Sequence, residues 1–277
     1  ERAVAFIERN RDRPFFLYVP HAMPHKPLAA SEEYYTKSGQ GLYGDVMAEL
    51  DWGVGRIVDK LKELGLEKRT LVLFTSDNGP WYGGSTGGLR GMKGMATEGG
   101  IRVPLIAWWP GRIAGGRVSR EPAVIMDLFA TSLAAAGVAG PVDRAIDGRD
   151  ILPMLTGDGR SPHEALFSQR GEKIDTVRSG RWKLHLRAAG ERRMLKPEDK
   201  WVDPRRPDGV RIIAPYEQAH PSAYPGLSTG DPIRGIALFD LESDRGEQHD
   251  VADRHPEVVE RLKGLVEKAE REAKAVN

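Results

Sequence analysis

Residues 70–79 of this 277-residue chain read TLVLFTSDNG, a continuous apolar run that ends in a short polar stretch. The run has the length and the β-branched content of a strand that is buried on both faces, which is typical of α/β sheets. Its polar end carries Asp77 and Asn78 side by side. This stretch therefore predicts both a fold class and a place where polar chemistry could occur.

Amphipathic helices and further apolar runs flank this strand along the chain. Apolar residues recur at spacings of three and four through residues 45–64, which predicts a helix that ends at Gly65. Residues 3–11 and 126–136 read as further helices, and residues 14–20 and 103–109 read as buried strands. The order strand, helix, strand, loop, strand, helix predicts a parallel α/β sheet.

The pattern changes after about Gly159. Residues 165–169 and 176–186 read as short antiparallel strands, the latter turning at residues 179–181. Residues 237–241 read as an edge strand and residues 258–269 as a closing helix. Residues 188–235 are irregular and rich in proline, glycine and charge, which is typical of a functional or mobile segment, with a substrate-facing loop as one interpretation. We therefore expect two parts: an α/β core over residues 1–160, and an antiparallel subdomain with a terminal helix over residues 161–277.

The composition excludes several classes of function. Basic residues number 41 and acidic residues 40, so there is no electrostatic footprint for a nucleic-acid or membrane-surface partner. The absence of cysteine excludes disulfides, thiolate nucleophiles and thiolate-bound zinc. No apolar run approaches the roughly 20 residues that span a bilayer, so we expect no membrane insertion, and the first residues lack the pattern of a signal peptide.

Polar groups stand beyond two of the predicted strands, where open α/β sheets collect their ligands. The carboxylate of Asp77 and the amide oxygen of Asn78 are hard oxygen ligands suited to Ca²⁺ or Mg²⁺. The alternative is an ordinary Asp-Asn-Gly turn, in which the side chains bond their own backbone.

Two further stretches offer groups for an oxyanion. Residues 21–27, HAMPHKP, contain prolines that restrict the backbone and could hold His25 toward a cleft, with surface histidines as the alternative. Residues 88–94, GLRGMKG, place Arg90 and Lys93 among glycines that permit close approach to a small anion, with a solvated loop as the alternative. Just after them, Glu98 and Arg102 flank two glycines, which favours a structural clamp over catalysis.

In this order and spacing, the four segments resemble the type I sulfatases of the alkaline-phosphatase-like superfamily over most of residues 14–155. The best match is residues 93–104, KGMATEGGIRVP, which looks like the family's lysine loop followed by its Glu-Gly-Gly-x-Arg-x-Pro stretch. Residues 119–128 and 146–150 are similar to the arylsulfatase and galactosamine-6-sulfatase branch, and residues 238–247 are similar to the family's closing segment. The resemblance implies an alkaline-phosphatase-like fold, with the C-terminal part of a mixed or parallel core sheet flanked by helices.

The same resemblance implies roles for four residues. Asp77 and Asn78 match two protein ligands of the family's calcium ion, with Mg²⁺ as the alternative cation. His25 and Lys93 match the residues that touch the sulfate group, and either could stabilise or protonate the leaving ester oxygen. The implied reaction is hydrolysis of an aryl or carbohydrate sulfate ester, so the expected partner is a small sulfate ester or a sulfated glycan.

Two parts of the family's site have no counterpart in this sequence. The family nucleophile is a formylglycine made from the first residue of a Cys/Ser-x-Pro-x-Arg segment, and no residue here begins that pattern. The paired aspartates that should follow the family's first strand are also absent, because the early carboxylates Glu1, Glu8 and Asp12 lie in a predicted surface helix. We therefore expect this chain to be the C-terminal part of a sulfatase and to be inactive alone. We also expect it to form a homo-oligomer or to pair with a complementing N-terminal part. The parent would be periplasmic, secreted or lysosome-like.

Two other functions remain open on the sequence. A phosphonate or phosphate monoester hydrolase of the same superfamily could use the same oxygen-rich metal site. A non-catalytic module could retain the basic loop only to bind sulfated glycans.

Overall fold

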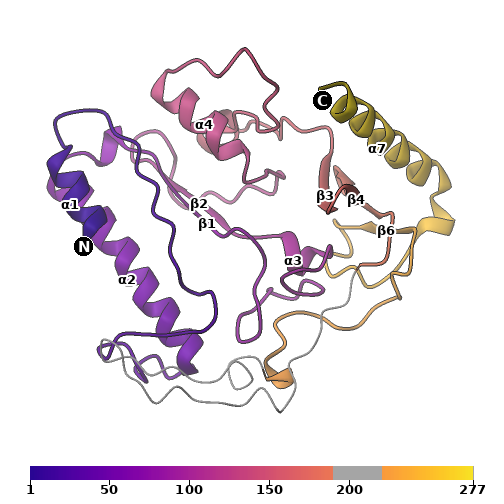
Figure 1. Ribbon diagram of the computed structural model, residues 1–277, viewed down its shortest axis with the longest axis horizontal. Coiled ribbons are helices and arrows are strands. Elements are labelled where there is room, and N and C mark those ends of the chain that lie inside the picture. Colours follow the sequence, from indigo (N-terminus) through magenta and orange to yellow (C-terminus); the bar gives the residue numbers. More distant parts are fainter. Residues whose placement is uncertain (190–219, 277) are drawn as a thin grey trace.

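The computed structural model describes residues 1–189 and 220–276 (Figure 1). The elements form a mixed α/β protein, as the sequence predicted. Those of the first part are α1 (Arg2–Arg9), α2 (Gly41–Glu63), β1 (Val72–Thr75), α3 (Glu98–Ile101), β2 (Leu105–Trp108), α4 (Asp127–Ala136) and α5 (Leu152–Thr156). Those of the second part are β3 (Leu166–Arg170), β4 (Lys173–Ser179), β5 (Trp182–His185), β6 (Ala237–Asp240) and α7 (Pro256–Val276).

The strands β1 and β2 form a two-stranded antiparallel sheet, with Val72 opposite Trp108 and Thr75 opposite Leu105. The predicted parallel arrangement is therefore wrong for this pair. A parallel connection needs a crossover of a dozen or more residues, usually a helix. Here the chain between the strands forms glycine-rich loops and only the four-residue helix α3, so it turns back and runs in the opposite direction.

Residues 14–20 are extended but pair with no strand in the part of the chain that the structure describes, so the predicted strand is wrong as well. The exposure of their side chains alternates as in a strand, with Phe16 76 % and Tyr18 75 % exposed. Phe15 and Leu17 instead pack against the buried cluster around Ile7. A strand also needs a neighbour for its ladder hydrogen bonds. Strand β1 has β2 as its neighbour in a sheet of two strands. It is half-buried along its length and is not enclosed on both faces as predicted.

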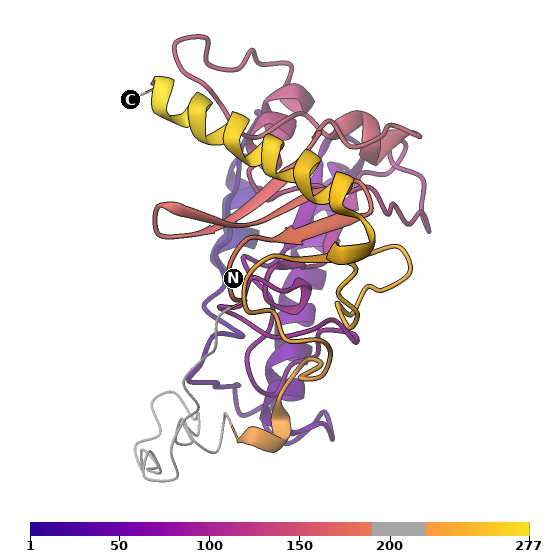
Figure 2. The same ribbon diagram turned by 90° about the vertical axis from the view of Figure 1, so that its right-hand side faces the viewer.

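The second sheet has the order β3-β4-β5-β6 and is antiparallel throughout. The predicted short strands, the turn at residues 179–181, the edge position of β6 and the closing helix are all confirmed. Helix α7 crosses one face of this sheet (Figure 2). The buried apolar residues that join the two are Val177, Leu184 and Leu238 of the sheet and Val259, Leu262 and Val266 of the helix. Burial of each such side chain stabilises the fold by about 1.5–3 kcal/mol.

The central strand β5 is buried on both faces. Leu184 belongs to the apolar cluster under α7. Its neighbours Lys183 and His185 point to the opposite face of the sheet, where they contact Glu98 and Glu247. All of these side chains are 2 % exposed or less. The sheet therefore carries an apolar layer on one face, and on the other it carries buried charged groups beside the apolar cluster of Ala237 and Phe239.

The expected boundary at residue 161 stays a prediction. Of the segment predicted to be a substrate-facing loop, residues 190–219 lie outside the described residues. Among the helices that the structure describes, none has the length and apolar character needed to cross a membrane.

Candidate anion and metal site

Asp77 and Asn78 follow β1 directly, in a turn that packs against the start of α3. Ser76 Oγ donates to the carbonyl oxygen of Asn78 at 3.1 Å, and Gly79 N donates to Gly100 O at 2.9 Å. The Asn78 amide nitrogen donates to the carbonyl of Gly79 at 3.2 Å, so the turn interpretation holds for this side chain. The exposed Asp77 carboxylate accepts no hydrogen bond from the described residues and is available to a cation.

The oxygen chemistry of this turn suits a hard cation, but two ligands are too few to hold one. Ca²⁺ takes six to eight oxygen ligands. No group of three or more His, Asp or Glu side chains within residues 1–189 and 220–276 is arranged to hold a metal ion. The oxygen atoms of Asp77 and of the Asn78 side chain are chemically suited to part of a calcium shell, and calcium binding by these two residues stays a prediction.

His25 is exposed, and a backbone contact fixes the orientation of its ring. Its Nδ1 lies 2.8 Å from the carbonyl oxygen of Lys26, and because a carbonyl can only accept, Nδ1 carries the proton. This leaves Nε2 as the atom that can meet a substrate. Burial lowers the pKa of the neighbouring Lys26 ammonium to about 8, and burial also lowers the pKa of His21. The described hydrogen bonds of His25 all lie within its own segment.

Lys93 lies in a loop that is joined to the turn of Asp77 and Asn78. Lys93 N donates to the carbonyl oxygen of Pro80 at 2.9 Å, so two stretches that the sequence singled out separately are neighbours in the fold. The loop closes on itself where Gly99 N donates to Arg90 O at 2.7 Å. Two aromatic side chains support the loop, since the buried Tyr82 and the half-buried Tyr224 pack with Met92.

The predicted clamp of Glu98 and Arg102 is confirmed, with Arg102 Nη1 3.4 Å from Glu98 Oε2. It belongs to a larger group of buried charges that sequence reasoning missed. Lys183 Nζ lies 3.0 Å from Glu98 Oε1 and 3.0 Å from Glu247 Oε1. The signal available in the sequence was the alternation of polar and apolar residues in 182–185, WKLH. This strand is too buried for water to supply hydrogen-bond partners to its polar side chains.

Burial and charge act in opposite directions on the titration of this group. Burial alone would raise the pKa of Glu247, but the charge of Lys183 and the hydrogen bond from His185 outweigh it and lower that pKa to about 2. Burial lowers the pKa of His185, which therefore donates from Nε2 to Glu247 Oε1 at 2.7 Å as a neutral imidazole. Glu247 is thus an ionised carboxylate inside the protein.

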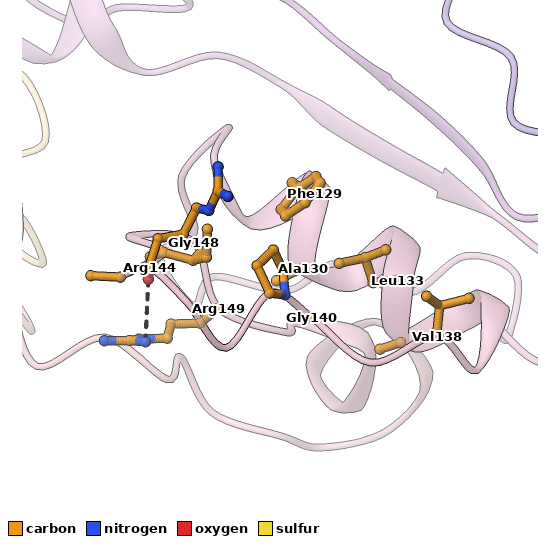
Figure 3. Close-up of a pocket in the computed structure, with 12 residues that line it drawn as sticks. Phe129, Ala130, Leu133, Val138, Gly140, Arg144, Gly148 and Arg149 are labelled. Carbon is orange, nitrogen blue, oxygen red and sulfur yellow. Dashed lines mark hydrogen bonds between the residues drawn. The ribbon is translucent and has the colours of Figure 1, made fainter.

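A surface hollow of about 480 Å³ lies elsewhere, between α4 and residues 138–149 (Figure 3). Phe129, Leu133 and Val138 give it an apolar wall. Arg144 pairs with Asp143, and Arg149 donates to the carbonyl of Ile146 at 3.4 Å. None of the four predicted site residues lines this hollow, so it is not part of the candidate site.

Known proteins resemble this chain along most of its length. The model of the sulfatase family matches residues 1–138. Dog N-acetylgalactosamine-6-sulfatase is 45 % identical over 194 residues, which are 67 % of this chain and 37 % of that protein. Human arylsulfatase A is 37 % identical over 273 residues, which are 93 % of this chain and 49 % of that protein. The chain therefore spans half or less of the length of these relatives.

Solved structures share the fold. A structure from Bacteroides thetaiotaomicron, reported under the metabolism of multiple glycosaminoglycans, has a TM-score of 0.74 at 28 % identity and covers 98 % of this chain and 53 % of the other. A sulfatase from Pseudoalteromonas sp. has a TM-score of 0.76 at 24 % identity, covering 99 % and 52 %. Together with the family match, these likenesses show that the chain has an alkaline-phosphatase-like fold and belongs to the sulfatase family.

Proposed function

We propose that this chain supplies one half of the active site of an enzyme that hydrolyses an aryl or carbohydrate sulfate ester. The observation that carries the proposal is the hydrogen bond from Lys93 N to Pro80 O, 2.9 Å long. It puts a lysine in a glycine-rich loop beside the turn of Asp77 and Asn78. A loop with a lysine beside a turn with two hard oxygen ligands suits an oxyanion held together with a divalent metal ion.

The protein side chains have separate tasks in this proposal. The Lys93 ammonium holds the sulfate oxygens and stabilises the charge that develops on them. His25 donates a proton from Nε2 to the leaving alkoxide oxygen when its ring carries protons on both nitrogens, with Nδ1 still bonded to Lys26 O. Asp77 and Asn78 hold Ca²⁺, with Mg²⁺ as the alternative. When bound, the cation supplies a positive charge that polarises the sulfate group.

The nucleophile has to come from another polypeptide segment. A formylglycine in such a segment would supply a hydrated aldehyde as the attacking group, and no Cys/Ser-x-Pro-x-Arg pattern occurs in the 277 residues. We therefore propose that the chain alone is inactive. Exposed Phe16 and Tyr18, together with Ile106, which is 58 % exposed on β2, offer an apolar surface for the complementing part.

The first experiment measures hydrolysis of 4-nitrophenyl sulfate and 4-nitrophenyl phosphate by the purified chain with Ca²⁺. We expect no turnover of either ester by the chain alone. Calcium-dependent sulfate release that Asp77→Ala abolishes would contradict the proposed inactivity. Turnover of the phosphate ester alone would favour the phosphate monoester alternative.

The second experiment measures binding of inorganic sulfate by calorimetry in the presence of Ca²⁺. We expect Lys93→Ala to weaken binding by about tenfold or more, because a charged hydrogen bond to an anion contributes about 1.5–3 kcal/mol. Lys68→Ala, which removes an exposed lysine on a distant turn, is the matched control and should leave the affinity unchanged. Equal effects of the two substitutions would contradict the proposed site. Binding of sulfated glycans without any turnover after complementation would favour a non-catalytic module.

A further inference from the structure

The loop that carries Lys93 is held at both ends by one residue from the far end of the chain. Arg90 stands at the start of the loop, and its Nη1 donates to the carbonyl oxygen of Glu247 at 2.7 Å. Glu98 stands at the end, and its backbone N donates to Glu247 Oε2 at 2.6 Å. No other residue in the described parts of the chain has hydrogen bonds to both ends.

The carboxylate of Glu247 is itself fixed in place. Its second oxygen, Oε1, lies 3.0 Å from Lys183 Nζ and 2.7 Å from His185 Nε2, both on β5. Lys183 also contacts Glu98 Oε1, so the ammonium bridges the two carboxylates. All four side chains are 2 % exposed or less. Charge-assisted hydrogen bonds in a buried site are strong and leave little freedom of movement.

The backbone of Glu247 lies in the left-handed region, with φ of 51°. This conformation is unfavourable for a residue with a Cβ, and glycine would adopt it at lower cost. It allows Glu247 to present its carbonyl to Arg90 and its carboxylate to Glu98 at once. Strained backbone of this kind persists where the surrounding structure holds it, and it concentrates at functional sites.

We propose that Glu247 is a positioning residue for Lys93: it fixes both ends of the loop of residues 90–98 and so sets the place of the lysine ammonium. The structural part of this proposal stands on the contacts of Glu247. The consequence for anion binding rests on the function proposed above. The sheet of β3–β6 thereby acts on the site through β5 and Glu247 without contributing a group that touches the anion.

The test is limited trypsin digestion of the intact chain, followed by mass spectrometry, because the loop contains a cleavage site after Lys93. The readout is the rate of cleavage after Lys93 divided by the rate after Lys62, an exposed lysine on α2. We expect Glu247→Gln and Glu247→Gly to raise this ratio tenfold or more. The Gln variant keeps the left-handed backbone and loses the negative charge, whereas the Gly variant relieves the strain and loses every carboxylate contact, so a rise in both assigns the effect to the carboxylate. Glu242→Gln, an exposed change in the same segment, should leave the ratio unchanged.

A ratio that stays constant while both cleavages accelerate would show a general loss of stability and would overturn the proposal. If the Glu247 variants do not fold, Arg90→Met removes only the attachment at the loop's start and should still raise the ratio severalfold; no change would overturn the proposal. Sulfate affinity is measured on the same variants, with Glu247→Gly expected to weaken it about tenfold. A wild-type chain that binds no sulfate would contradict the proposed function, while the cleavage ratio would still decide whether Glu247 positions the loop.

Discussion

Lys183 Nζ lies 3.0 Å from Glu98 Oε1, and the two side chains come from positions 85 residues apart. Both are almost completely buried. The pair joins the central strand of the second sheet to the first turn of α3. It therefore connects the antiparallel sheet to the loop that carries the candidate anion-binding lysine.

Removal of Lys183 is expected to be strongly destabilising. Lys183→Met leaves the carboxylates of Glu98 and Glu247 buried beside each other without their common cation, and breaking a buried ion pair in this way costs about 3–5 kcal/mol. Lys263→Met is the control, because it removes an exposed partner of Glu260 worth at most about 1 kcal/mol. Urea unfolding followed by circular dichroism measures both. Equal losses would mean that the buried group contributes no more than a surface pair.

The stability of the protein should depend on the ionisation of Glu247 in acid. Its pKa in the folded protein is lowered to about 2 from an ordinary 4.5, so its contribution is fully present above pH 4.5 and is lost as the pH falls toward 2. The groups that face it are the charged Lys183 and Arg90, the neutral imidazole of His185, and the carboxylate of Glu98 on the other side of Lys183. A pKa unit corresponds to about 1.4 kcal/mol, so the full effect is on the order of 3 kcal/mol.

The measurement is the free energy of unfolding between pH 6 and pH 2.5 for the wild type and for Glu247→Gln. Glutamine does not ionise, so the stability difference between the two proteins should shrink as the pH falls. Other carboxylates titrate in both proteins and cancel in the comparison. A difference that is constant over this pH range would show that Glu247 has an ordinary pKa.

Close backbone packing around α3 predicts a strict requirement for glycine at position 100. A Cβ at Gly100 would overlap the carbonyl oxygen of Met95 and lie 2.6 Å from that of Met92. Gly100→Ala should therefore cost about 3 kcal/mol, as overpacking against backbone does. Gly264→Ala is the opposite case: position 264 is in α7 with open space around it, and alanine there should stabilise by about 0.5–1 kcal/mol.

Thermal unfolding of these two variants tests the packing directly. Opposite shifts of the melting temperature are the expected result. A Gly100→Ala variant as stable as the wild type would mean that the loops around α3 move apart readily.

The exposed apolar surface beside β1 and β2 predicts self-association of the isolated chain. Phe16 and Tyr18 are about three-quarters exposed, and their chain neighbours Phe15 and Leu17 pack with Val72 of β1, so these two aromatic rings add apolar surface there that another chain can cover. We expect light scattering to show a mass that rises with concentration. The double substitution Phe16→Ser with Tyr18→Ser should reduce this association.

Val142→Ser is the control for association, because Val142 is 98 % exposed but lies in the loop after α4. It should leave the concentration dependence unchanged. A wild-type chain that stays monomeric on concentration would contradict the prediction.

The sequence by itself determined most of the local structure. Periodicities of 3.6 and 2 depend on neighbouring residues, so the helix ending at Gly65, the hairpin of β4 and β5 and the closing helix were all predicted. The ordered motifs also identified the family, because each motif is continuous in the chain, while the roles of His25, Asp77, Asn78 and Lys93 stay predictions. The clamp of Glu98 and Arg102 is similarly local, a pair four residues apart on one turn.

Only the tertiary structure decided the relationships between distant segments. The antiparallel direction of β1 and β2 depends on how the glycine-rich connection turns back, which no apolar pattern encodes. Lys183, His185 and Glu247 look like ordinary surface residues in the sequence, since buried charge is recognisable only when its partners are in place. Glu98 lies 85 residues from Lys183 and 149 residues from Glu247 along the chain, and the desolvation of the whole group is a property of the packed fold alone.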